Sequence, residues 1–148
     1  MNFALNMGGM RFAAGAALSL ALAAGAARAE VVHYAASLSG AQESPATDSA
    51  GKGSLSADLD TATRTLTYKV TYSGLTGPAV AAHFHGPAAP GANAGVMVPV
   101  TDLSDPMTGS ATLTDEQISG LKAGAWYFNI HTKAHPGGEI RGQVHAAD

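Results

Sequence analysis

The chain has 148 residues, with eight basic and eleven acidic side chains and no cysteine. Its formal net charge of −3 argues against binding to nucleic acid, because contacts to phosphates require a basic surface. The absence of cysteine excludes disulfides and the zinc and iron–sulfur sites that depend on thiolates. Any metal ion must therefore be held by nitrogen and oxygen ligands.

The N-terminal residues have the features of a secretory signal peptide. Arg11 precedes an Ala- and Leu-rich stretch over residues 12–27, and residues 27–29 (ARA) fit the small-x-small cleavage pattern. The apolar stretch is short for a membrane span, and no cysteine follows it that would carry a lipid anchor. We therefore expect cleavage after Ala29, a domain of residues 30–148 with a net charge of −5, no membrane anchor, and a periplasmic or secreted location.

The remaining chain consists of short alternating segments separated by turn residues. In residues 65–72, the clearest strand, apolar side chains alternate with threonine and lysine. The predicted strands are residues 31–38, 54–59, 65–72, 79–85, 95–100, 109–113, 126–131 and 139–144. Thr114 and Gln117 form a capping-box pattern that predicts one short helix, ended by Gly124. About eight strands without a βαβ rhythm predict a single all-β domain, an antiparallel sandwich or barrel.

Two histidines stand one residue apart at the end of the predicted strand over residues 79–85. Residues i and i+2 of a strand project from the same face, so His83 and His85 lie side by side, opposite Val80, Ala82 and Phe84. Two neutral imidazoles on one rigid strand are half of a transition-metal site.

The last predicted hairpin adds a third histidine. Trp126, Phe128 and Ile130 form the apolar face of its first strand, which leaves His131 on the polar face. The seven-residue connection over 132–138 predicts the cross-strand pairs His131–Glu139, Asn129–Arg141 and Tyr127–Gln143. Asn129 and Glu139 are then candidates to orient His131 through its second ring nitrogen. The alternative interpretation is an ordinary solvated sheet face.

Three imidazoles without a thiolate suit Cu(II) or Zn(II), and the Irving–Williams order favours copper. The candidates for a fourth ligand are His33, His135, His145 and water. His135 lies in a Pro/Gly-rich turn and His145 lies near the C-terminus, so we expect both in solvent. The face of His33 is not fixed by the pattern, and this residue stays a candidate ligand. Met97 is expected in the core.

Four sequence blocks resemble the CHRD domain, a module named after chordin and found in bacterial secreted proteins. They are residues 35–45 (AASLSGAQESP), 82–87 (AHFHGP), 121–132 (LKAGAWYFNIHT) and 136–143 (PGGEIRGQ). The resemblance extends over nearly all of residues 30–148. It implies a Greek-key, immunoglobulin-like β-sandwich related to the fold of the copper–zinc superoxide dismutases.

In that fold, an H-x-H pair and a later strand-end histidine bind copper, and an arginine near the C-terminus guides the anion. The resemblance therefore implies copper ligation by His83, His85 and His131, and anion guidance by Arg141. Residues 86–95 contain no counterpart of the dismutase zinc-binding loop, so the likeness is to a copper-only version.

Two functions follow as expectations. The first is a copper-binding protein that carries or sequesters the ion, or reacts as a superoxide dismutase-like enzyme with superoxide or another small anion. The second is a non-catalytic structural or protein-interaction module whose histidines are incidental.

Overall fold

The computed structural model describes residues 28–148, so the predicted signal peptide lies almost entirely outside the described residues. In chain order the elements are β1 (Val31–Ser39), the 3-10 turn η1 (Gly40–Gln42), β2 (Lys52–Asp60), β3 (Thr65–Ser73), β4 (Ala79–His85), β5 (Val96–Pro99), β6 (Met107–Thr112), α1 (Asp115–Lys122), β7 (Trp126–Thr132) and β8 (Ile140–Ala146). Every predicted strand and the predicted helix are present, with ends shifted by a few residues. In this part of the chain no helix is long and apolar enough to cross a membrane.

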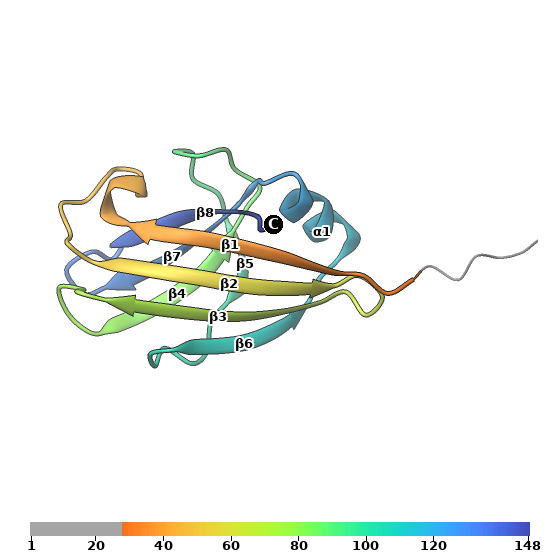
Figure 1. The fold of residues 1–148 in the computed structure, drawn as a ribbon. Coiled ribbons are helices and arrows are strands. Elements are labelled where there is room, and N and C mark those ends of the chain that lie inside the picture. Colours follow the sequence, from red (N-terminus) through yellow and green to blue (C-terminus); the bar gives the residue numbers. More distant parts are fainter. Residues whose placement is uncertain (1–27) are drawn as a thin grey trace, which may run out of the picture.

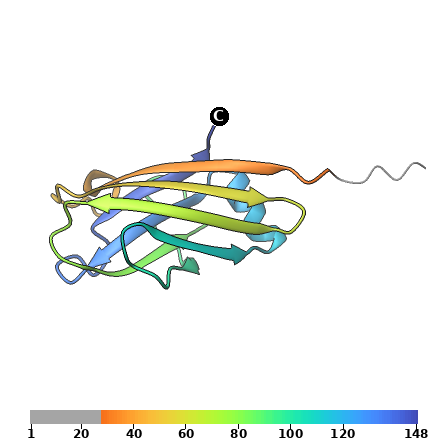
Figure 2. The ribbon, with the colours of Figure 1, turned by 60° about the horizontal axis from the view of Figure 1, so that its bottom comes forward.

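The strands form one continuous antiparallel sheet in the order β5-β4-β7-β8-β1-β2-β3-β6. This sheet curls nearly into a barrel, with β1, β2, β3 and β6 as one wall and β4, β5, β7 and β8 as the other (Figures 1 and 2). The walls meet through side chains: the Phe84 ring of β4 packs edge-on against the Tyr68 ring of β3, with centroids 5.2 Å apart. The all-β antiparallel prediction is confirmed.

The wall of β1, β2 and β3 follows the alternation seen in the sequence. β2 and β3 bury every second residue, since one face meets the core and the other meets water. Val80 of β4 departs from the prediction. It is 55% exposed instead of sharing the inner face with Ala82 and Phe84, and the register of β4 on β7 shifts between Ala79 and Ala81.

Helix α1 begins with the predicted capping box. Thr114 Oγ1 accepts a hydrogen bond from the Gln117 backbone N–H at 3.2 Å, and Gln117 Oε1 accepts one from the Thr114 backbone N–H at 2.9 Å. Gly124, at a φ of +69°, follows the helix and lets the chain turn into β7. The helix buries Leu121 and lies at one end of the curled sheet (Figure 1).

β7 and β8 are covered on both faces. Their inner face meets the core, yet three of their outward-facing residues, Tyr127, Asn129 and Arg141, are also buried. Two irregular segments contact this outer face. Residues 43–48 line a cavity together with Tyr127, Asn129 and His131, and residues 86–95 accept hydrogen bonds from Arg141. The covered outer face is a second, polar interior, and it contains the predicted site residues.

Candidate metal centre

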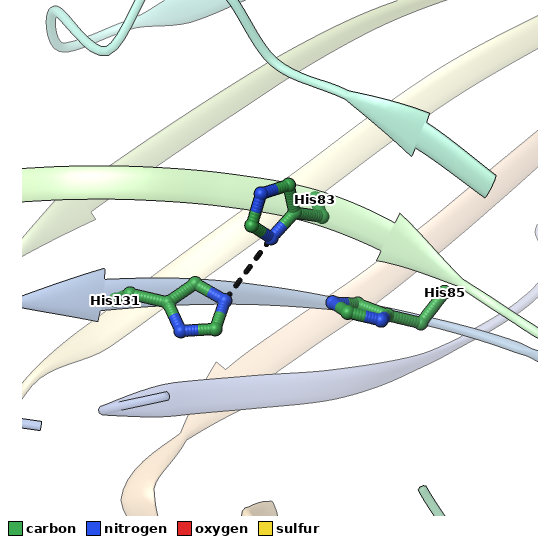
Figure 3. Close-up of side chains that lie close together, drawn as sticks. All are labelled: His83, His85 and His131. Atoms are coloured by element: carbon green, nitrogen blue, oxygen red, sulfur yellow. Dashed lines mark hydrogen bonds between the residues drawn. The ribbon is translucent and has the colours of Figure 1, made fainter. Parts of the chain in front are cut away.

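Three of the predicted ligands meet on the outer face of β4 and β7 (Figure 3). One nitrogen from each ring of His83, His85 and His131 lies within 4.8 Å of the others. His83 Nδ1 and His131 Nε2 are 3.1 Å apart. We call these three residues the histidine trio. Within residues 28–148 no other group of three or more histidine or carboxylate side chains is placed to hold a metal ion.

Backbone carbonyls fix the hydrogen on two of the rings. His85 Nδ1–H donates to the carbonyl of Ala94 and His131 Nδ1–H donates to that of Pro136, both at 2.9 Å. A carbonyl can only accept, so in the neutral rings both Nε2 atoms keep a lone pair. Partners of this kind orient metal-binding histidines in known sites.

The orientation of His131 differs in detail from the prediction. The sequence predicts that Asn129 and Glu139 orient this ring, whereas Pro136 holds it and Asn129 contacts His85. Glu139 instead accepts hydrogen bonds from the hydroxyls of Ser49, Thr76 and Thr132. Two of the three predicted cross-strand pairs are confirmed, Asn129 with Arg141 and Tyr127 with Gln143, whereas His131–Glu139 is not among the pairs of β7 and β8, and the Glu139 backbone N–H donates to Ile130 O instead.

The surroundings of His83 and His131 favour neutral rings. Burial lowers the pKa of His83, and the neighbouring charges of His131 and His85 lower it further. Burial also lowers the pKa of His131, while the Pro136 carbonyl acts against this shift. Neutral imidazole is the form that binds metal ions.

A stack of three side chains supports His85. The rings of His85 and Tyr127 are parallel within 5°, with centroids 4.7 Å apart. The Arg141 guanidinium carbon lies 3.4 Å from the centroid of Tyr127. Arg141 is 1% exposed and donates to Ala92 O at 2.6 Å and to Asn93 Oδ1 at 3.0 Å. The guanidinium therefore anchors the loop over residues 86–95 and is separated from His85 by one ring.

A cavity of about 780 Å³ opens beside His85 and His131. Residues 43–48 and 134–138 contribute to its lining, together with Tyr127 and Asn129. Glu43, 7% exposed, lines the cavity, and its Oε1 has no hydrogen-bond partner. Burial raises the pKa of the Glu43 carboxyl, against the effects of the Asn129 amide and the Arg141 charge. The cavity gives a small molecule access to His85 and His131.

Sequence reasoning missed two residues of this region. Glu43 lies in an irregular segment, where no period or spacing points to the histidines. Strand alternation placed Tyr127 on the face of His131, but its stacking on His85 was not predicted, because aromatic side chains are by default assigned to a core.

The other candidate histidines do not belong to the trio. The His33 side chain is 62% exposed on the β1 wall, with Nδ1 2.6 Å from Asp58 Oδ1. His145 is exposed, as predicted, while His135 is half-buried and lines the cavity. Met97 is half-buried and packs against the core.

Fold and trio together define an all-β domain with a candidate transition-metal centre. Residues 34–144 match the family model of the CHRD domain. The chain belongs to the CHRD family, and the resemblance found in the sequence blocks is confirmed. No curated protein matched the chain, and no solved structure did.

Proposed function

We propose that this CHRD domain binds one copper ion through His83, His85 and His131. The observation that carries the proposal is the convergence of three imidazole nitrogens within 4.8 Å of one another. Three nitrogen ligands without a thiolate suit Cu(II) or Zn(II), and the Irving–Williams order favours copper. The adjoining cavity leaves room for a further ligand.

Binding, carriage or sequestration ranks before catalysis in this proposal. Bound copper would supply one-electron redox chemistry, and the cavity would admit superoxide or another small anion. The Arg141 guanidinium donates to Ala92 and Asn93 and stacks on Tyr127, so it would not contact such an anion directly. Its positive charge would instead attract the anion from a distance.

The proposed location is the periplasm or the extracellular space, with residues 1–29 removed as a signal peptide. The proposed detailed architecture is the Greek-key, immunoglobulin-like sandwich that the family resemblance implies. Intact mass spectrometry of the exported protein tests the cleavage: a chain that starts at Glu30 supports it, and a retained N-terminus contradicts it.

Metal analysis tests the site. Untagged protein loaded with Cu²⁺ and desalted should retain one copper per chain, and His83→Ala/His131→Ala should retain none. The matched control is His33→Ala/His145→Ala, which removes two exposed histidines outside the trio and should retain one copper. Folded wild-type protein without copper after loading would overturn the proposal and leave the structural or protein-interaction module.

A second measurement separates an enzyme from a carrier. Superoxide decay in the presence of the copper-loaded protein should exceed decay in buffer if the domain is a dismutase. A rate no faster than buffer would end the enzymatic interpretation and leave copper binding intact.

A further inference from the structure

Asn129 lies beside the histidine trio and contacts His85. It lies directly across from His83 in the register of β4 on β7, and two residues before His131 on the same strand. Its side chain shares the covered outer face and is 3% exposed. The amide therefore has protein groups, and whatever the site binds, as its neighbours.

One end of this amide faces a ring nitrogen that has no hydrogen to give. Asn129 Oδ1 lies 3.0 Å from His85 Nε2, while His85 Nδ1–H is already donated to Ala94. In the neutral ring Nε2 is an acceptor, so an oxygen lone pair and a nitrogen lone pair point at each other. Two facing acceptors repel unless a cation lies between them.

The surroundings of Nδ2, at the other end of the amide, oppose a 180° rotation that would exchange Oδ1 and Nδ2. A Cβ atom on Gly138 would overlap both Glu43 Oε1 and Asn129 Nδ2, so the amide nitrogen lies beside the Glu43 carboxyl. Turning the amide would bring Oδ1 against this carboxyl and move the repulsion there. The carboxyl of Glu43 thus favours the orientation in which Oδ1 faces His85.

Two of the separations match adjacent ligands of one ion. Ligand atoms ~2.0–2.2 Å from a metal lie roughly 3.0 Å apart at a right angle and roughly 3.4 Å apart in a tetrahedron. The two close pairs, His85 Nε2–Asn129 Oδ1 at 3.0 Å and His83 Nδ1–His131 Nε2 at 3.1 Å, are near the right-angle value. Right-angle arrangements of nitrogen and oxygen ligands are typical of Cu(II).

We infer that the amide oxygen of Asn129 is the fourth protein ligand of the ion held by His83, His85 and His131. This inference rests on the proposed copper binding and adds an oxygen ligand to its three nitrogens. Glu43 acts as a positioning residue that orients the amide.

Three variants test the inference. Asn129→Leu removes the oxygen at similar size, Asn129→Asp keeps an oxygen and adds a negative charge, and Gln143→Leu removes another carboxamide from the outer face as the matched control.

Cu²⁺ affinity is measured against a competing chelator, and the Cu²⁺ EPR spectrum is recorded. Asn129→Leu should weaken copper binding by roughly 10–100-fold. This is the loss found when a hydrogen-bond partner of a metal ligand is removed, and the loss of a ligand itself should be no smaller. Asn129→Asp should bind more tightly, both should shift the EPR spectrum, and Gln143→Leu should do neither.

Isotope labelling gives a direct readout. Residues 30–148 contain two asparagines, Asn93 and Asn129. Copper-loaded protein labelled with ¹³Cγ-asparagine should show a ¹³C hyperfine coupling in ENDOR spectra that survives Asn93→Ala and is lost in Asn129→Leu. A merely structural amide would not produce this coupling.

The outcomes separate the inference from the proposed function. Wild-type affinity and an unchanged EPR spectrum in Asn129→Leu would overturn the asparagine ligand while copper binding by the trio stands. If Asn129→Leu does not fold by near-UV circular dichroism, Asn129→Asp decides, and an unchanged affinity and spectrum there overturns the inference. Wild-type protein that takes up no copper would overturn the proposed function itself.

Discussion

The two walls of the curled sheet place histidines in opposite settings. His33 on the β1 wall is 62% exposed, and its partner Asp58 is exposed as well. His85 on the β4 wall is buried between the Tyr127 ring and the Ala94 carbonyl. Both residues point away from the core, so strand alternation does not separate them. The difference is the cover, because residues 43–48 and 86–95 contact the outer face of the wall formed by β4, β5, β7 and β8, which we call the covered wall. His33 and Asp58, on the wall of β1, β2, β3 and β6 that we call the open wall, are exposed.

The cover changes what a polar side chain contributes. On the open wall water satisfies Asp58 and His33, so their pairing contributes little to stability. On the covered wall each buried polar group needs a protein partner, and leaving it unpaired is costly. We therefore expect substitutions of outward-facing residues to be severe on one wall and mild on the other.

The largest effect is expected for Arg141→Met. This change keeps the apolar stem but removes two hydrogen bonds to the 86–95 loop and the stacking on Tyr127. We expect a loss of about 2–4 kcal/mol in the free energy of unfolding, measured with urea. The matched control is Arg64→Met, which breaks an exposed pair with Asp115 and should cost less than about 1 kcal/mol. Equal losses of unfolding free energy in the two variants would mean that the contacts of Arg141 under the cover do not stabilise the fold more than an exposed pair does.

Acid should destabilise the covered wall through Glu139. Burial alone raises the pKa of this carboxyl, but hydrogen bonds from Ser49, Thr132 and Thr76 outweigh it and bring the pKa from 4.5 to about 2. A carboxyl whose pKa is lower in the folded state stabilises the fold above its unfolded pKa. This contribution, roughly 3 kcal/mol, should be lost as the pH falls from about 5 to about 2.

Glu139→Gln tests the assignment. The variant should be less stable than wild type at pH 6, and its unfolding free energy should depend less on pH between 5 and 2. Glu116→Gln, which removes an exposed carboxyl in α1, serves as the control and should keep the wild-type slope. If Glu139→Gln keeps that slope too, another carboxyl is responsible.

A smaller effect is expected for Tyr127→Phe. The Tyr127 hydroxyl accepts from Ala94 N at 3.2 Å and donates to Ala94 O at 3.3 Å. Its loss should cost about 1 kcal/mol in urea unfolding, the usual size for such bonds. Copper affinity should stay close to wild type because the ring still stacks on His85, whereas Tyr127→Leu should weaken copper binding. A Tyr127→Leu variant with unchanged affinity would show that the stack does not support the site.

The sequence was sufficient for the open wall and for part of the covered one. Alternation predicts the strands, and the i, i+2 rule predicts that His83 and His85 share a face with His131 after the hairpin register is assigned. The cover was not predictable in this way, because residues 43–48 and 86–95 have no period and their places depend on tertiary contacts. Alternation alone therefore puts Arg141 in water, whereas the loop buries it. The same rule misplaces Val80, since a one-residue shift in register turns a side chain to the other face.

The smallest effect is expected at the short contact between His33 and Asp58 on the open wall. His33 Nδ1 and Asp58 Oδ1 are 2.6 Å apart, a distance that by itself suggests a strong contact. Each side chain is more than half exposed, however, so water and salt screen the pair. Asp58→Asn should therefore change the free energy of unfolding by less than about 0.5 kcal/mol, and the difference should shrink further in 1 M salt. A loss above about 1 kcal/mol would contradict this, since the open wall would then depend on its outward-facing polar groups as the covered wall does.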